Sequence, residues 1–264
     1  GDIHGCYKPL AEYLGEIDPE NYYIFLGDYL DRGSENAQVM ELMLKLASME
    51  NVTVLEGNHE INLRDYGLAD GAGSREFRLQ TAEELAKAGL TRKAVYGFYR
   101  KLGQCFLYTY HGKKVLATHG GLAKMPENLT LVATAEMIYG TGEYEDGLDV
   151  DINFAELAQE NEYQVHGHRN YEGVPVQVNE HCFNLDGGVE LGGQLRALEL
   201  IEEGFTTINR GNALEYTTRV KPNNDDSAKK NPKTIHELLE SFNANPYIKE
   251  RSFGNISFYN FSIE

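Results

Sequence analysis

The chain has 264 residues, of which 41% are apolar, and its 24 basic and 41 acidic side chains give a formal net charge of −17. This apolar content argues against global disorder, and the length fits one large α/β domain, alone or with an appendage. No apolar run is long enough for a transmembrane helix. The acidity argues against a protein that holds nucleic acid through phosphate contacts alone, although bound metal ions would reverse the local charge.

In the first half of the chain, predicted strands alternate with predicted helices. Tyr22–Leu26 is a short apolar run typical of a buried strand, and a helix is predicted over Glu35–Met49 with Ser34 as its N-cap. Val52–Leu55 predicts the next strand. Ser74–Lys101 has apolar residues at helical spacing with a glycine in the middle, which indicates two helices.

The second half continues in the same way. Phe154–Glu162 is a weaker helical pattern, and Leu195–Ile201 with Phe205–Ile208 predicts a β-hairpin. His111 falls in a turn typical of another hairpin. Strands are predicted at Val115–Thr118, Gln164–Val165 and His181–Leu185. The alternation of strands and helices favours an α/β fold with partly parallel sheets.

Two segments differ from this pattern. Between Lys124 and Arg169 there are ten acids and no basic residue, which predicts a solvated loop, or alternatively a loop for a partner or for specificity. The polar, proline-bounded run Lys221–Lys233 predicts a linker. Beyond it we expect a short helix over Thr234–Phe242 and a strand over Phe253–Ile263. The expected organisation is a domain over 1–210, a polar linker over 211–233, and an appendage over 234–264 that packs on the domain or leads towards another one.

The three cysteines Cys6, Cys105 and Cys182 are widely spaced and form no CxxC pair. An odd number in this arrangement is typical of reduced thiols. No charged-then-apolar leader is present, so we expect no signal peptide and a cytoplasmic location.

Polar side chains follow each of the predicted strands, and loops at the carboxyl ends of strands converge on one crevice in open α/β folds. Carboxylate, imidazole and amide groups without thiolate suit Mn²⁺, Fe²⁺ or Zn²⁺ better than a dedicated Mg²⁺ or Ca²⁺ site. The early loops offer one ligand set: Asp2, His4 and Asp28. The later loops offer a second set: Asn58, His119 and one of His166 or His168. If Asp28 bridges two ions, they can share a hydroxide and direct it at phosphorus.

Three further residues suit the chemistry of phosphate esters. Arg32 can clamp phosphate oxygens through two N–H groups. His59 can donate a proton to the leaving alkoxide, with Asp31 orienting the imidazole and keeping it charged.

Four motifs, in the order GDIHG, GDYLDRG, GNHE and HGG, resemble the calcineurin-like metallophosphoesterases, in particular the bacterial type of the phosphoprotein phosphatase branch. The later run HGHRN followed by NLDGGVELGGQLRAL is similar to bacterial members. The resemblance extends from Gly1 to about Ile208. A buried strand usually precedes the first motif, so we expect a few residues upstream of it.

This resemblance implies a four-layer α/β/β/α sandwich, and it implies two divalent metal ions, with Mn²⁺ favoured and Fe²⁺ or Zn²⁺ as alternatives. The implied ligands are Asp2, His4 and Asp28 for the first ion, and Asp28, Asn58, His119 and His168 for the second. The implied catalytic residues are the acid pair His59 and Asp31 and the phosphate ligand Arg32.

Some assignments stay open at this point. His166 remains a rival to His168 as a metal ligand. Arg64 and Arg169 are candidates for a second phosphate-binding arginine. Asp186 is expected to support the site through hydrogen bonds.

The function expected from these residues is a metal-dependent phosphatase that hydrolyses phosphomonoesters of the serine/threonine phosphoprotein type by attack of a metal-bridging hydroxide. One alternative is a nucleotide or RNA-end phosphatase or phosphodiesterase, because the tail KERSFGNISFYNF resembles the start of an RNA-ligase-type module found in bacterial RNA-repair fusions. A diadenosine polyphosphate hydrolase and a non-catalytic scaffold are further alternatives. The expected partner is a phosphorylated substrate, either phosphoprotein or nucleotide, and neither membrane association nor stable binding of nucleic acid is expected.

Overall fold

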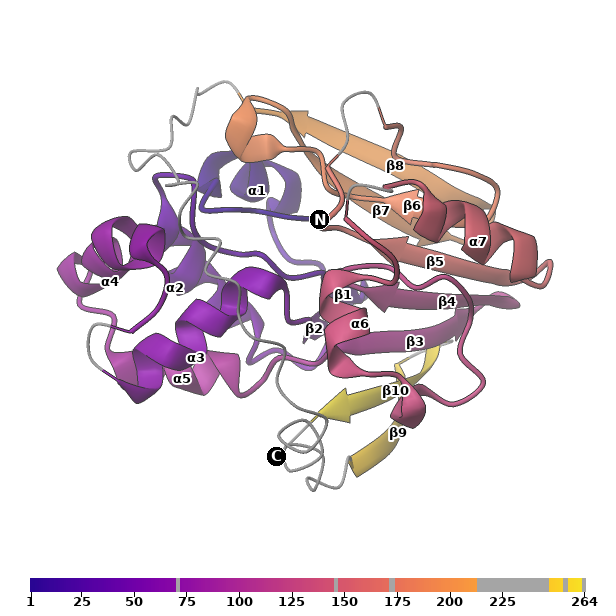
Figure 1. Ribbon diagram of the computed structural model, residues 1–264, viewed down its shortest axis with the longest axis horizontal. Coiled ribbons are helices and arrows are strands. Elements are labelled where there is room, and N and C mark those ends of the chain that lie inside the picture. The colour runs from indigo at the N-terminus through magenta and orange to yellow at the C-terminus, as the bar shows by residue number, and fades with distance from the viewer. Residues whose placement is uncertain (70–71, 145–146, 171–173, 213–246, 254–255, 263–264) are drawn as a thin grey trace.

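A computed structural model of the chain describes residues 1–69, 72–144, 147–170, 174–212, 247–253 and 256–262 (Figure 1). The α-helices are α1 Tyr7–Leu14, α2 Asn36–Leu46, α3 Ile61–Leu68, α4 Ala82–Lys87, α5 Arg92–Tyr99, α6 Thr134–Tyr139 and α7 Asp149–Leu157. The strands are β1 Tyr23–Phe25, β2 Val52–Val54, β3 Cys105–Tyr110, β4 Lys113–Thr118, β5 Glu162–His166, β6 Cys182–Asn184, β7 Gln194–Ile201, β8 Gly204–Gly211, β9 Tyr247–Phe253 and β10 Ile256–Ser262.

The strands form three sheets. β1 pairs in parallel with β2, and β7 pairs with β8 as an antiparallel hairpin. The third sheet has the order β6-β5-β4-β3-β10-β9, with β4, β5 and β6 parallel and the remaining pairs antiparallel. The expected mixture of parallel and antiparallel pairing and the expected hairpin near residue 200 are therefore present.

Three separate clusters of buried apolar side chains define the layers of the fold. The first joins α1–α5 to one face of β1 and β2, and includes Met40, Phe98 and Phe25. The second lies between the sheets, where Leu26 faces the strands of the six-stranded sheet. The third packs α6 against the outer face of that sheet. Three interfaces require four layers, so the predicted α/β/β/α sandwich is confirmed (Figure 1).

Side-chain alternation in β4 shows why the sequence forms this sandwich. Val115 and Ala117 enter the cluster between the sheets, whereas Leu116 points into the cluster under α6. A strand buried on both faces reads as a continuous apolar run, because neither face meets water.

Several predicted elements differ from those in the structure. Ser34 does not cap α2. The Glu84 carboxylate instead accepts the Asn36 amide at 3.0 Å. The helix predicted over Phe154–Glu162 lies earlier, at α7, since the acids of its first turn favour a helix N-terminus. Three helices were not predicted: α1, which has Pro9 in its first turn, α3 and α6. Strand β3 was not predicted either, although His111 does lie in the turn after it.

The acidic segment between Lys124 and Arg169 was predicted as mainly a solvated loop, but the structure shows that it also contains the regular elements α6, α7 and β5. Two of its acids, Asp151 and Glu162, are buried. Part of the acidic charge therefore lies within the folded sandwich.

The tail adds to the six-stranded sheet through β10, which pairs antiparallel with β3. The strand predicted over Phe253–Ile263 is present as β10, and β9, which pairs with it and precedes it, was not predicted. Gly211, assigned to the linker, is the last residue of β8. The predicted linker Lys221–Lys233 and helix Thr234–Phe242 lie outside the described residues.

Two further features of the described residues bear on the class of protein. All three cysteines are buried and free. None of the described helices is both long enough and apolar enough to cross a membrane.

Candidate metal centre

The predicted site residues lie on loops that backbone hydrogen bonds connect to one another. The carbonyl of Asp28 accepts the amides of Ile3 and His4 at 3.0 and 2.9 Å, which joins the GDIHG loop to the GDYLDRG loop. The amide of Gly167 bonds to the carbonyl of His119 at 2.9 Å and joins the two later loops in the same way. These loops follow β1, β4 and β5, so their side chains converge as the topology predicts.

Left-handed backbone marks this site. Of the six non-glycine residues with positive φ in the described chain, five are predicted site residues, with φ between 44° and 73°. They are His4, Asp28, Asp31, Arg32 and His168. Such conformations cost on the order of 1 kcal/mol or more each, and they persist where the surrounding structure holds them for function.

The imidazoles of His4 and His119 are oriented alike. His4 Nδ1 lies 3.1 Å from the carbonyl of Leu30, and His119 Nδ1 lies 2.9 Å from the carbonyl of Leu26. A carbonyl only accepts, so each Nδ1 donates, and in the neutral ring each Nε2 keeps its lone pair. Those two Nε2 atoms lie 3.5 and 3.4 Å from the two carboxylate oxygens of Asp28.

This arrangement fits a pair of cations. Two groups of potential ligands have their ligand atoms within 4.8 Å of one another, and Asp28 belongs to both. One group is His4, Asp28 and His59, and the other is Asp28, His119 and His168. In a metal-binding histidine, one ring nitrogen usually donates a hydrogen bond, often to a carbonyl, and the other nitrogen keeps its lone pair for the metal. His4 and His119 have this arrangement, and their Nε2 atoms approach the two oxygens of Asp28.

The remaining predicted ligands lie beside these groups. Asn58 Oδ1 is 3.1 Å from His119 Nε2. The Asp2 carboxylate accepts the backbone amide of His168 at 3.1 Å through Oδ2. Burial raises the pKa of Asp2 to about 6, with His119 opposing and Asp28 adding to the shift. The structure therefore brings all six predicted ligands into one region, while their individual roles stay predictions.

The protonation of the histidines differs across the site. Burial and then the charge of His119 lower the pKa of His168 to about 3, so this ring stays neutral. Burial and then Arg32 also hold the pKa of His4 well below its usual value. Burial alone lowers the pKa of His119, but the Asp28 carboxylate outweighs it and raises the value to about 10. In the protein without bound metal, protonated His119 thus supplies the positive charge beside Asp28 that a metal cation would otherwise supply.

The predicted acid pair is also assembled. His59 Nδ1 lies 2.8 Å from Asp31 Oδ2. Burial alone lowers the pKa of His59, but the charge of Asp28 and the hydrogen bond that His59 donates to Asp31 raise it to about 9. Asp31 is fixed in turn by Asn62, whose amide donates to Oδ2 at 2.9 Å, and by the hydroxyl of Thr81. This geometry suits a histidine that carries a proton at neutral pH.

Arg32 lies between the two imidazoles of the early loops. Its Nη1 is 3.0 Å from His4 Nε2, and its Nη2 is 3.2 Å from His59 Nε2. Nη1 also donates to Glu190 Oε1 at 2.9 Å. The guanidinium therefore faces the place where the predicted acid and the first ligand group meet, as a phosphate clamp would.

The two histidines after β5 are separated by the structure. His166 is fully buried and points away from the ligand groups, since its Nε2 is 2.9 Å from Asp151 Oδ1 and its Nδ1 is 3.0 Å from the carbonyl of Gly167. His168 joins the second ligand group instead. This geometry favours His168 over its rival.

The two candidates for a second phosphate-binding arginine are engaged elsewhere. Arg169 is buried, and its guanidinium donates to backbone carbonyls that include those of Gly120 and Thr141. It holds the loop after α6 and has no place for a phosphate. Arg64 is half-exposed and paired with Asp65 at 2.8 Å.

Asp186 was expected to support the site through hydrogen bonds. Its carboxylate accepts the amide of Gly188, in its own turn, at 3.0 Å. Burial, followed by the charge of Asp2, raises the pKa of Asp186. The side chain therefore orders the turn that follows β6 and lies close enough to Asp2 to influence its charge.

The role of Glu60 was not predicted from the sequence, although it is the last residue of the GNHE motif and of the 3-10 turn η1 Asn58–Glu60. Its buried carboxylate accepts the amides of Asp28 and Gly57, both at 2.8 Å, and that of Tyr29 at 3.0 Å. It thereby fixes the backbone on both sides of the shared ligand. The available signal was an acid directly after the predicted ligand Asn58 and the predicted proton donor His59.

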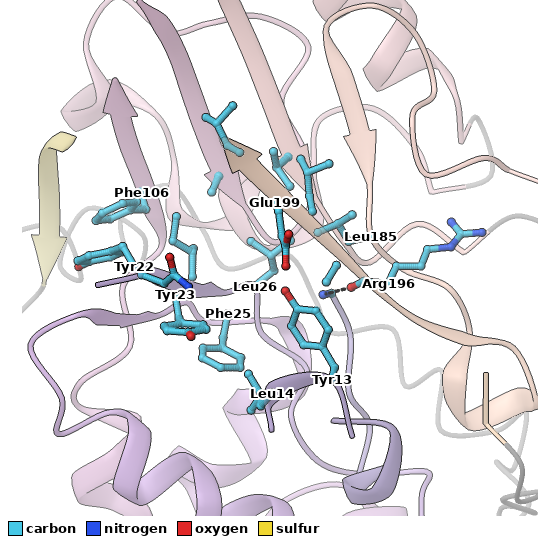
Figure 2. Close-up of a pocket in the computed structure, with 18 of the residues that line it drawn as sticks. Tyr13, Leu14, Tyr22, Tyr23, Phe25, Leu26, Phe106, Leu185, Arg196 and Glu199 are labelled. Carbon is cyan, nitrogen blue, oxygen red and sulfur yellow. Dashed lines mark hydrogen bonds between the residues drawn. The ribbon is translucent and has the colours of Figure 1, made fainter. Parts of the chain in front are cut away.

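A cavity lined by described residues lies apart from this site. It has a volume of about 610 Å³ between β1 and β7, each of which has one edge without a strand partner among the described residues (Figure 2). Its lining includes Tyr13, Phe25 and Phe106 but none of the predicted metal ligands or catalytic residues.

The four-layer sandwich and the two ligand groups around one carboxylate define a fold of the metallophosphoesterase class. Residues 1–244 match the calcineurin-like phosphoesterase family, and the chain belongs to that family. This confirms the resemblance seen in the four motifs.

One curated relative is a serine/threonine-protein phosphatase, C23G10.1, of Caenorhabditis elegans, which is 28% identical over 216 residues. The match covers 78% of this chain but only 43% of that relative, so the chain spans less than half of its length. The family and the name of this relative together support a hydrolase of phosphoric esters.

A solved structure shows the same fold. The crystal structure of “a putative diadenosine tetraphosphatase” matches with a TM-score of 0.56 and 19% identity, covering 80% of this chain and 91% of that one. At this identity the likeness shows the fold alone.

Proposed function

We propose that this chain is a dinuclear metal-dependent phosphatase that hydrolyses phosphomonoesters of the serine/threonine phosphoprotein type. One observation carries the proposal: Asp28 is shared by two groups of metal-ligating side chains, and the acid pair His59–Asp31 and Arg32 lie beside the first. The relative named a serine/threonine-protein phosphatase supports the substrate class. Mn²⁺ is the proposed native metal, with Fe²⁺ or Zn²⁺ as alternatives.

Two divalent cations at these groups would neutralise phosphate charge and lower the pKa of the attacking water. The chain's own residues supply the rest. Arg32 holds a phosphoryl oxygen through its N–H groups, which orients the phosphorus for in-line attack. As the bond from phosphorus to the leaving oxygen breaks, His59 gives its proton to that oxygen. Asp31 holds the imidazole in place throughout, and no phosphoenzyme is formed.

The test is Mn²⁺-dependent hydrolysis of p-nitrophenyl phosphate and of a phosphothreonine peptide, each with and without a chelator. We expect turnover of both that the chelator abolishes and added Mn²⁺ restores. Turnover that survives the chelator would refute the metal-dependent mechanism. The absence of turnover with metal bound would instead favour a non-catalytic scaffold.

A second candidate is a phosphatase or phosphodiesterase for nucleotides or RNA ends, including diadenosine polyphosphates. It is favoured by two aromatic rings beside the metal ligand His168. Tyr144 and Tyr139 lie with their ring centroids 5.3 and 6.2 Å from that imidazole, and both are about half exposed. Exposed aromatic faces suit the stacking of a nucleobase. A nucleoside 2′,3′-cyclic phosphate and diadenosine tetraphosphate in the same assay decide between the candidates, because preference for either would replace the phosphoprotein assignment.

A further inference from the structure

We propose that Glu190 is a positioning residue for phosphate binding, which acts by holding Arg32 in its clamping orientation. The proposal rests on the function proposed above, since it concerns the same site. Glu190 lies within the run NLDGGVELGGQLRAL, but no role was predicted for it and it belongs to neither predicted ligand set.

The first observation is the contact itself. Glu190 Oε1 accepts from Arg32 Nη1 at 2.9 Å, and the carboxylate is buried, with 2% of the side chain exposed. The Arg32 side chain is 38% exposed, so its outer part is open to solvent. A buried carboxylate that accepts from one nitrogen of a guanidinium fixes the orientation of the whole planar group. A charge-assisted bond of this kind fixes orientation as well as contributing energy.

The second observation is that Glu190 is presented by a tightly connected turn. It lies in the 3-10 turn η4 Val189–Leu191, between left-handed Gly188 and Gly192, with φ values of 57° and 85°. The amide of Gly193 bonds to the carbonyl of Gly188 at 3.0 Å, and Asn212 donates to the carbonyl of Val189 at 2.9 Å. This turn connects β6 to β7, so the position from which Glu190 contacts Arg32 is fixed by two strands of the fold.

The third observation concerns the other partners of Arg32. Nη1 also lies 3.0 Å from His4 Nε2, the atom that would ligate a cation. Its contact with His59 involves the proposed acid. During catalysis His4 would ligate a cation and His59 would transfer a proton, whereas the carboxylate of Glu190 belongs to neither ligand group. Of these three side-chain contacts, the one to Glu190 can therefore persist while metal is bound and while the proton is transferred.

The charges around Glu190 explain why it needs Arg32. Glu190 raises the pKa values of Asp2 and Asp186, so three carboxylates share this part of the site. One of its own oxygens, Oε2, is buried without a hydrogen-bond partner. Without Arg32 this carboxylate would be buried close to two other acids with no opposing charge. The arginine and the glutamate therefore hold each other in place.

The experiment measures binding of inorganic phosphate to the metal-loaded protein by calorimetry, with metal content determined for each variant. We expect Glu190→Ala to weaken phosphate binding about tenfold, equivalent to about 1.4 kcal/mol, and to raise KM for p-nitrophenyl phosphate while kcat changes much less. Glu190→Gln keeps an oxygen that accepts from Arg32 and should stay close to wild type. Leu191→Ala, at a side chain 71% exposed on the same turn, is the matched control and should have no effect.

A double-mutant cycle separates positioning from general structural support. In an Arg32→Ala background, Glu190→Ala should cause no further loss, because there is no guanidinium left to orient. An equal loss in both backgrounds would overturn the proposal, and so would loss of metal, which would make Glu190 a ligand. Tighter phosphate binding by Glu190→Ala would also overturn it, because the carboxylate would then act by repelling phosphate.

The outcomes also distinguish this inference from the proposed function. If the wild-type protein binds phosphate but hydrolyses no ester, the proposed function fails while the cycle still tests Glu190. If it hydrolyses esters but the cycle shows no coupling, only the inference fails. If the metal-loaded wild type binds no phosphate, both fail.

Discussion

Replacing His59 by Ala should slow hydrolysis of an alkyl phosphate far more than hydrolysis of p-nitrophenyl phosphate. An alkoxide leaves poorly unless it receives a proton, whereas p-nitrophenolate leaves as a stabilised anion. The pKa of His59 is raised to about 9, so at pH 7 the protonated imidazole is favoured by about 100 to 1. In the protein without bound metal, His59 therefore carries the proton at neutral pH.

The expected magnitude follows from this protonation and from the geometry of the pair. His59 is held 2.8 Å from Asp31, which fixes the ring for proton delivery. A positioned general acid contributes a factor of about 10² to 10⁴, equivalent to about 2.7 to 5.4 kcal/mol of barrier. We expect His59→Ala to lose this factor in kcat with a phosphothreonine peptide, and less than about tenfold with p-nitrophenyl phosphate.

The assay compares kcat on the two substrates and measures bound metal by elemental analysis. His111→Ala, in the turn after β3, is the control for losing a histidine elsewhere. Equal losses on both substrates would refute the role of His59 as a proton donor. His59 also belongs to a group of potential metal ligands with His4 and Asp28. Loss of one metal ion in His59→Ala would therefore show that His59 is a ligand and not the proton donor.

Three further predictions test other parts of the site. Asp28→Asn keeps the shape but removes the shared charge, so it should abolish hydrolysis of every substrate and release both metal ions; near-normal activity would contradict the two-metal mechanism. Glu60→Gln leaves one oxygen for three backbone amides, so it should lower the free energy of unfolding by about 1 to 3 kcal/mol, measured with denaturant, and an unchanged value would mean that these bonds add little. Asp31→Asn should lower the pKa of His59, measured by NMR titration of the metal-free protein. The pKa of His59 is raised from 6.5 to about 9, so the charged His59–Asp31 pair stabilises the fold fully below about pH 6.5. This contribution is lost as the pH rises through about 9. The difference in unfolding free energy between wild type and variant should therefore shrink over that range.

The motif loops could be predicted from the sequence because they contain the carboxylate, imidazole and amide side chains that a metal site requires. Asp28 and His119 follow short apolar runs, and the topology of an α/β fold brings the ends of such strands together. The four layers were expected only from the resemblance to the family, and the structure supplies the physical reason, since β4 alternates between two cores. The resemblance to the family favoured His168 over its rival His166, and the hydrogen bond between His166 and Asp151 adds the geometric reason, because it turns His166 away from the ligand groups.

Other features depended on partners that are distant in the sequence. Glu190 and Arg32 are separated by 158 positions, and no local pattern indicates that they meet. The capping of α2 by Glu84 replaced the local cap expected from Ser34, because a tertiary contact supplied the acceptor. The acids of α7 were attributed to a solvated loop because charge alone does not distinguish a loop from the first turn of a helix.

The left-handed backbone at the site also limits which residues evolution can place there. Asp28 and Asp31, at φ of 50° and 73°, lie where asparagine, aspartate and glycine are tolerated and β-branched residues are strongly disfavoured. A descendant that had lost its metal ions and its activity would still need one of those residues to close the same loops. At these two positions the identity of the residue therefore reflects the conformation of the chain as well as its chemistry. His59, which does not have this backbone conformation, would be free to change sooner once catalysis was no longer selected.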